Sequence, residues 1–180
     1  MTIFDLETAR QNYFSLFDLP CQQGLDAVQL EALYRDIQAR VHPDKHAHLS
    51  DSDKRLAMQW ATRVNEAYLT LKDPLKRARY LLELTGHDIK LETNTAMPAE
   101  FLMAQMELRE AVAEARETGD IDALDYRHRK LKMDIRSECD DLQVAMDARQ
   151  HDRAGELVRQ LMFQEKLLQE IDAALAHLET

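Results

Sequence analysis

Helix-breaking residues are scarce in this sequence, and their positions limit the folds that are open to it. The 180 residues include only four glycines and four prolines, whereas Ala, Leu, Glu, Gln and Arg, which favour helices, are abundant. Residues that favour strands are sparse, so the composition predicts an all-α fold. The length suits one large domain or two small ones, and a 45% share of apolar residues is enough for a core.

Two apolar stripes of helical period lie in the first part of the chain, on either side of a polar segment. The stripe after Asp26, a suitable N-cap, consists of Leu30, Leu33, Tyr34, Ile37 and Val41. The second stripe consists of Ala57, Trp60, Ala61, Val64, Ala67, Tyr68 and Leu71, and Ser50, Asp51 or Ser52 can cap its helix. Pro43 ends the first helix and Asp73-Pro74 the second. We expect residues 1–84 to form a helical hairpin with short helices at both ends.

The second part of the chain is predicted to be a three-helix bundle. Residues 85–97 are expected to be a linker, and Pro98 then begins helical stretches near 98–117, 121–148 and 151–178. Short breaks separate them, at Gly119-Asp120 and around His151. The amphipathic pattern and the short turns favour a bundle over residues 98–180.

The first helix of this bundle carries apolar residues on two faces. Its core stripe is expected to be Phe101, Ala104, Leu108, Ala111, Val112 and Ala115, which share one side of the helix. A second apolar group lies on nearly the opposite side and is bordered by three acids, and Phe163 is likewise off the main stripe of the last helix. The residues concerned are Leu102, Met103, Met106, Glu107, Glu110, Glu114 and Phe163. Such a second face either packs on the N-terminal domain or binds another protein.

The charge distribution restricts the classes of partner. The net charge is −10, which argues against general nucleic-acid binding because that requires a basic field. Residues 1–80 carry acids and bases in roughly equal number, about 11 each, and the acidic excess lies in 81–180. No secretion signal, transit peptide or membrane-spanning run is recognisable, so we expect a cytoplasmic protein without membrane attachment. Cys21 and Cys139 form no CxxC pair and are expected to be buried or semi-buried thiols in a reducing compartment, without a ligand or redox role.

The polar segment between the two hairpin helices has three interpretations from its residues alone. His42, Asp44, His46 and His48 are residue types that bind zinc or iron, but alternate positions in a short irregular loop seldom converge on one ion. His42 and Asp44 could act as acid and base in a hydrolase, but no nucleophile or glycine-lined pocket accompanies them. The third interpretation is a solvated polar loop.

The order of these features resembles the J-domain of co-chaperones. The residues that carry this resemblance are His42-Pro43-Asp44, the preceding stripe with Tyr34 and Ile37, and Asn65-Glu66-Ala67-Tyr68 with Leu71. The stretches PLKRARYLLEL and EFLMAQMELRE, followed by an acidic bundle, narrow the resemblance to the HscB-type co-chaperone of iron–sulfur cluster biogenesis. The similarity covers essentially the whole chain, and Met106 departs from the family pattern, in which leucine is common.

The resemblance implies an L-shaped, all-α protein that is not an enzyme and needs no cofactor or metal. Its J-domain would bind an HscA-type chaperone ATPase and stimulate ATP hydrolysis, and its bundle would bind an IscU-type iron–sulfur scaffold protein. The chaperone-binding residues would be Arg35, Arg40, His42, Pro43, Asp44 and Lys45. The scaffold-binding residues would be the seven off-stripe residues named above. The remaining alternatives are a J-domain co-chaperone for a different client and a metalloprotein that uses the histidines.

Overall fold

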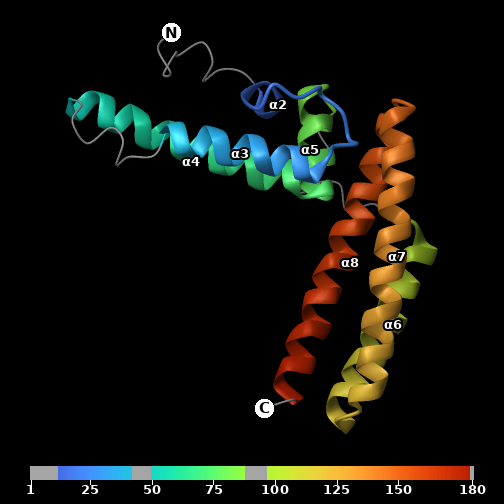
Figure 1. The fold of residues 1–180 in the computed structure, drawn as a ribbon. Coiled ribbons are helices and arrows are strands. Elements are labelled where there is room, and N and C mark those ends of the chain that lie inside the picture. Colours follow the sequence, from blue (N-terminus) through green and yellow to red (C-terminus); the bar gives the residue numbers. More distant parts are fainter. Residues whose placement is uncertain (1–11, 42–49, 88–96, 179–180) are drawn as a thin grey trace. The chain divides into compact units, whose positions relative to one another are not determined.

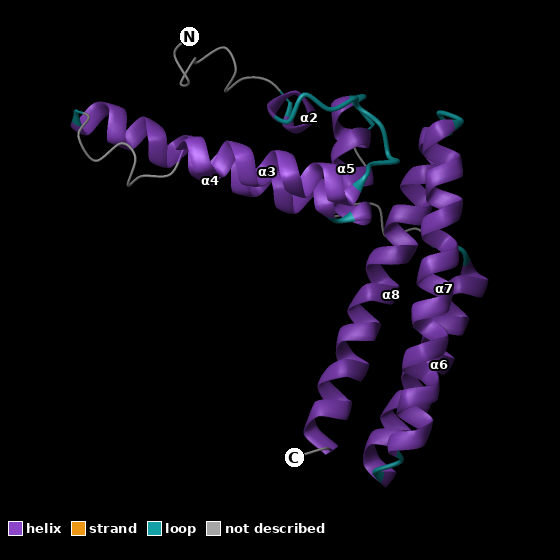
Figure 2. Ribbon diagram, viewed as in Figure 1, coloured by secondary structure: helices purple, strands orange, loops and turns teal. Residues whose placement is uncertain are grey.

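The computed structural model describes residues 12–41, 50–87 and 97–178, and every regular element in these ranges is a helix. Figures 1 and 2 show these helices as α2 to α8. The elements are α2 (Tyr13–Leu16), α3 (Ala27–Val41), α4 (Asp51–Lys72), α5 (Pro74–Leu84), α6 (Ala99–Thr118), α7 (Ile121–Asp147) and α8 (His151–Leu178). The all-α prediction is therefore confirmed, and the predicted helix ends lie close to the observed ones.

The chain divides into two compact units, and the division lies between Leu81 and Leu82 within α5. The first unit holds α2, α3, α4 and most of α5, and the second holds the three long helices α6, α7 and α8. Most of the expected linker, 85–97, lies outside the described residues.

The first unit is built around the predicted pair α3 and α4, which lie side by side in Figure 1. Asp26 caps α3 by accepting hydrogen bonds from the backbone N–H groups of Val28 and Gln29, and Ser50 caps α4 by accepting one from Asp53. Each cap satisfies donors that a helix leaves open at its first turn. The buried stripe of α4 consists of Ala57, Trp60, Val64, Ala67 and Leu71.

Aromatic side chains pack the short helix α2 against α4 and α5. Phe14 is fully buried, and the rings of Tyr13 and Tyr80 stack with centroids 4.5 Å apart. The Tyr80 hydroxyl also accepts a hydrogen bond from the backbone N–H of Tyr13, at 2.9 Å. The Arg63 guanidinium lies over the Tyr13 ring. These contacts pack the N-terminal aromatic segment onto α4 and α5.

A buried arginine joins α4 to α5, and the sequence pattern did not indicate it. The Asp73 side chain caps α5, accepting hydrogen bonds from the backbone N–H groups of Leu75 and Lys76. One turn later, the buried Arg77 donates to the carbonyl of Leu71, one of the acceptors that the last turn of α4 leaves open. Burial lowers the pKa of this guanidinium, and Asp73 opposes the effect.

The second unit is a three-helix bundle in which α7 and α8 form the longest contact and α6 packs on both. Asp120 caps α7 through the N–H of Ala123, and Gly119 ends α6 with a positive φ of 68°, which glycine adopts without strain. The bundle core between the three helices consists of Val112, Ala115, Leu124, Leu131, Leu167, Ile171 and Ala174.

One part of the predicted core stripe of α6 is wrong. Ala104 is exposed, whereas the adjacent Gln105 is buried at 7% relative exposure. At 100° per residue, Gln105 lies on the same arc as Phe101 and Val112, so its position suits the core. Because its side chain is polar, the sequence pattern did not indicate it as a core residue. Ala104 lies at the edge of the stripe, where α6 borders a cavity rather than a packed neighbour.

Candidate protein-docking surfaces

The segment that carries the expected chaperone-binding motif lies outside the described residues. This applies to His42, Pro43, Asp44 and Lys45, and to His46 and His48 of the metal interpretation. The structure does describe the two ends between which this segment runs. Helix α3 ends at Val41, and Ser50 begins α4 with its side-chain cap.

A polar and aromatic clamp holds α3 against α4. The rings of Tyr34 and Tyr68 stack with centroids 4.0 Å apart, and the Tyr34 hydroxyl donates to Asn65 Oδ1 at 2.8 Å. The same hydroxyl accepts a hydrogen bond from Gln38 Nε2, and the Lys72 ammonium lies over the Tyr68 ring. Three of these residues, Tyr34, Asn65 and Tyr68, belong to the pattern on which the J-domain resemblance rests. Their role here is to hold the two helices of the hairpin together.

The two expected arginines of the chaperone surface are both exposed on α3. The Arg35 guanidinium pairs with Glu31 one turn earlier, and 74% of the Arg35 side chain remains accessible. Arg40 lies in the last turn of α3, next to the motif segment. An exposed ion pair between residues four apart on a helix is weak, so Arg35 can exchange Glu31 for an acid of a partner at small cost.

The off-stripe residues of α6 form an exposed apolar surface, which we call the α6 patch: Leu102, Met103 and Met106. Their relative exposures are 40%, 62% and 62%. The three acids at its border, Glu107, Glu110 and Glu114, are also exposed. The helix therefore buries one side in the bundle and leaves the other without cover from any described residue, as the helical pattern predicted for a second face.

Phe163 lies at the level of the α6 patch, although it belongs to α8. Its neighbour Gln164 lines one cavity together with Phe101 and Gln105 of α6. Further along both helices, Arg109 of α6 pairs with Glu170 of α8 at 3.7 Å. The two contacts show that α6 and α8 run in the same direction, and they place Leu102 and Phe163 at equivalent heights. Phe163 has a relative exposure of 36%, so it can extend the patch across two helices.

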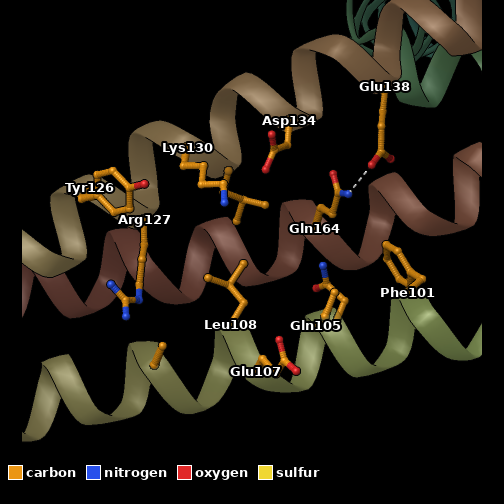
Figure 3. A pocket seen from close by; sticks show the side chains of 13 residues that line it. Phe101, Gln105, Glu107, Leu108, Tyr126, Arg127, Lys130, Asp134, Glu138 and Gln164 are labelled. Atoms are coloured by element: carbon orange, nitrogen blue, oxygen red, sulfur yellow. Dashed lines mark hydrogen bonds between the residues drawn. The ribbon is translucent and has the colours of Figure 1, made fainter.

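A cavity of about 540 Å³ opens between α6, α7 and α8, on the side of α6 that faces α7 (Figure 3). Apolar side chains of α6, including Phe101 and Leu108, form part of its lining, and α7 contributes charged ones. Gln164 Nε2 donates to Glu138 Oε1 at 2.6 Å within it. Burial raises the pKa of the Glu138 carboxyl, and the hydrogen bond from Gln164 opposes this shift. Of the polar residues that line this cavity, only Glu107 was predicted from the sequence to belong to a site.

The described residues contain no cluster of three or more His, Cys, Asp and Glu side chains arranged to hold a metal ion. Cys21 is exposed and Cys139 is half-buried. The expectation that both thiols are buried or semi-buried is therefore wrong for Cys21. No described helix is both long and apolar enough to cross a bilayer.

Comparison with known proteins identifies relatives over almost the full length. The family model of the HscB C-terminal oligomerisation domain matches residues 97–172. The co-chaperone protein HscB homologue of Aromatoleum aromaticum is 53% identical over 173 residues, which cover 95% of this chain and 97% of the relative. The HscB homologue of Paraburkholderia xenovorans is 49% identical over 174 residues, with 97% and 99% covered.

Solved structures agree with the sequence relatives. The chaperone HscB of Vibrio cholerae superimposes with a TM-score of 0.83 at 37% identity, covering 93% of this chain and 99% of that one. The human co-chaperone HscB gives a TM-score of 0.87 at 27% identity, with 96% and 90% covered. Both the helical hairpin and the bundle lie within these matches. The hairpin is therefore a J-domain, and the chain belongs to the HscB family of co-chaperones of iron–sulfur cluster assembly.

Proposed function

We propose that this chain brings an IscU-type iron–sulfur scaffold protein to an HscA-type chaperone and stimulates the ATPase of that chaperone. The observation that carries the proposal is the α6 patch, an acid-bordered apolar surface left exposed on a chain that matches a member of this co-chaperone family over 95% of its length. The chain would act by binding two proteins and would catalyse no reaction itself. We expect it to work in the bacterial cytoplasm, because its relatives in Aromatoleum aromaticum and Paraburkholderia xenovorans are bacterial proteins.

The J-domain would bind the chaperone through the segment between α3 and α4. A stacked tyrosine pair and the hydrogen bond from Tyr34 to Asn65 hold the two helices in a defined register. The ends of the motif segment are therefore held at a set separation, and Pro43 restricts the backbone within it. Asp44 would accept an arginine of the chaperone, and the flanking bases Arg35, Arg40 and Lys45 would speed association with an acidic surface.

The α6 patch with Phe163 would bind the scaffold. Methionine side chains are flexible and polarisable, so Met103 and Met106 can adapt to the shape of a partner. Leu102 and Phe163 are stiffer and less exposed, which suits them to act as central anchors. The acids Glu107, Glu110 and Glu114 would attract a basic partner and orient it. Binding both proteins on one chain would raise the effective concentration of scaffold at the chaperone.

The chaperone half of the proposal is tested by Asp44→Asn. This change keeps the size of the side chain but removes the carboxylate that would pair with arginine, so stimulation of the chaperone ATPase should be abolished. The assay is steady-state ATP hydrolysis by purified HscA-type chaperone, with and without this protein. Asp36→Asn, at an exposed position of α3, is the matched control and should stimulate normally. Normal stimulation by Asp44→Asn would reject the assignment of the motif.

The scaffold half is tested by combining Leu102→Ala with Phe163→Ala. Binding to purified IscU-type scaffold, measured by calorimetry, should weaken by about 1–3 kcal/mol or more if these residues are anchors. Met133→Ala on α7, whose side chain is also exposed, is the control and should bind as the parent does. Unchanged binding by the double variant would place the scaffold site elsewhere. Binding of other clients with no binding of scaffold would favour the alternative of a J-domain co-chaperone for a different client.

The matched family description mentions oligomerisation, so a second copy of this chain is the competing occupant of the α6 patch. Sedimentation of the parent and of the double variant distinguishes the two. Under our proposal, the double variant should have the same oligomeric state as the parent. A dimer that dissociates in the double variant would instead assign the patch to self-association.

A further inference from the structure

The cavity beside α6 contains buried hydrogen-bond acceptors that no described residue satisfies. They are Oε1 of Gln105, Oε1 of Gln164 and Oε2 of Glu138. Gln105 and Gln164 have relative exposures of 7% and 5%, and both line the cavity. Leaving such atoms unpaired costs free energy, and native proteins seldom do so without a reason.

The hydrogen bond between two of these residues determines which atoms remain available. Gln164 donates its Nε2 to Glu138 Oε1 (Figure 3), so its amide oxygen is the group left over. The second carboxyl oxygen of Glu138 is also an acceptor when the group is ionised. This end of the cavity therefore offers three unpaired acceptors, which a guanidinium or ammonium group complements.

The charges around Glu138 favour a cation in the same place. Asp134 and Asp141 on α7 both raise its pKa, as neighbouring negative charges do. Arg153 of α8 acts in the opposite direction, but its guanidinium pairs with Glu156 of its own helix at 3.2 Å. The nearest basic lining residue of α7, Lys130, precedes Glu138 by two helical turns, or roughly 12 Å along the axis, so its repulsion of a cation near Glu138 is weak.

The cavity adjoins the proposed scaffold surface. Glu107 belongs to the acidic border of the α6 patch and also lines the cavity, and Gln164 follows Phe163 directly in α8. A protein that covers the patch together with Glu107 would therefore reach the edge of the cavity. The terminal torsions of glutamine and glutamate are broad, so these side chains can turn their oxygens toward a group that enters.

We infer that this cavity takes the guanidinium or ammonium group of a basic side chain of the scaffold protein, an inference that rests on the function proposed above. The cation donates to the oxygens of Glu138, Gln164 and Gln105 while the apolar part of its side chain lies against Phe101 and Leu108. The α6 patch then supplies apolar contact, and the cavity supplies a buried charge pair. A buried pair of this kind contributes chiefly by slowing dissociation.

Glu138→Gln tests the inference, because it removes the charge while retaining the shape and an oxygen that can accept from Gln164. Calorimetry with purified IscU-type scaffold should show about tenfold weaker binding, the usual effect of losing a hydrogen-bonded charge. Asp140→Asn is the matched control on the same helix, since two residues turn the side chain by about 200°, and it should stay within about twofold of the parent. Thermal melting of each variant shows whether the fold is intact.

A double-mutant cycle identifies the scaffold side of the contact. Each exposed Arg and Lys of the scaffold is replaced by Gln, and binding is measured with the parent and with Glu138→Gln. One scaffold substitution should weaken binding to the parent about tenfold and have little further effect with Glu138→Gln. Lowering the pH to protonate Glu138 should likewise reduce the difference in scaffold affinity between the parent and Glu138→Gln. Additive losses at every scaffold position, or equal pH profiles, would overturn the inference.

The two proposals fail in different ways. If Leu102→Ala with Phe163→Ala weakens scaffold binding but Glu138→Gln behaves like Asp140→Asn, the cavity inference is wrong and the patch assignment stands. If neither variant weakens binding, the proposed scaffold surface is wrong and the cavity inference falls with it. If only Glu138→Gln weakens binding and the cycle shows coupling, the cavity is the contact and the patch assignment is wrong.

Discussion

Amphipathic helices pack in different ways in the two parts of the molecule, the hairpin of α3 and α4 and the bundle of α6, α7 and α8. In the hairpin, specific cross-helix contacts supplement the core, namely the Tyr34–Tyr68 stack and the hydrogen bond from the Tyr34 hydroxyl to Asn65. In the bundle, α7 and α8 bury a long apolar seam, whereas α6 has an exposed apolar patch and borders a cavity where it faces α7.

This difference corresponds to two ways of presenting a binding surface. A hairpin that displays a short segment must hold its two helix ends in register, and directional contacts achieve this. A helix that binds a partner along its own length needs side chains that are not already used in the core. The three exposed apolar residues of α6 fall within five successive positions, whereas the exposed Met58 and Leu69 of the hairpin are three turns apart on α4.

The largest expected effect tests whether α6 is packed less tightly than the seam of α7 and α8. Leu167→Ala removes a fully buried side chain and should lower the free energy of unfolding by about 2–5 kcal/mol. Leu108→Ala removes a half-buried side chain that borders the cavity, so its cost should be less than half as large. Urea denaturation followed by circular dichroism measures both. Equal costs would contradict the distinction between α6 and the seam.

The next prediction concerns the clamp in the hairpin. Tyr34→Phe keeps the ring stack but removes the hydroxyl that bonds Asn65 and Gln38, and it should destabilise the hairpin by about 1 kcal/mol. Fluorescence of Trp60 follows this unit alone, because Trp60 is the single tryptophan and belongs to α4. Tyr126→Phe, at an exposed tyrosine of α7, is the control. A Tyr34→Phe variant as stable as the parent would show that stacking alone holds the helices together.

The smallest effect concerns the pH dependence of the bundle. Because burial raises the pKa of Glu138 above its ordinary value of 4.5, the folded state holds this proton more tightly than the unfolded state does. Its contribution to stability is complete below pH 4.5 and is lost as the pH rises through the folded-state pKa. Solvent screens this half-exposed group, so the loss should be under about 1 kcal/mol.

Glu138→Gln checks this prediction, because a glutamine does not titrate. Thermal unfolding of the isolated protein across the acid and neutral range should give a flatter pH profile for the variant, with slightly greater stability than the parent at neutral pH. Asp140→Asn should leave the profile of the parent unchanged. Parallel profiles for the parent and Glu138→Gln would mean that the carboxyl is not perturbed in the folded state.

Local features of the sequence were sufficient for the helices and for the α6 patch. Caps act over one turn, so Asp26 and Ser50 could be recognised as candidate caps without knowledge of the fold. The patch could be found in the same way, because the angle between Met103 and the core stripe depends only on helical geometry. The motif residues His42, Pro43 and Asp44 stay predictions, since they lie outside the described residues.

Polar residues in buried positions could not be found in this way. Arginine and glutamine usually lie on protein surfaces, yet Arg77, Gln105 and Gln164 are all buried. Each is buried because a neighbouring helix covers it or supplies a partner, as Leu71 does for Arg77 and Glu138 does for Gln164. A periodic pattern records only the preference of each residue and carries no information on how closely a second helix approaches.

The sequence by itself determined an all-α chain of the HscB family, the extent of its helices and one exposed apolar face on α6, because helical period and capping are local properties. Only the tertiary structure decided that Phe163 lies at the height of Leu102, and that Glu138, Gln105 and Gln164 meet in one cavity. Those relations depend on the direction and register of three helices packed together. The contacts that set this register, such as Arg109 with Glu170, join residues far apart in the chain.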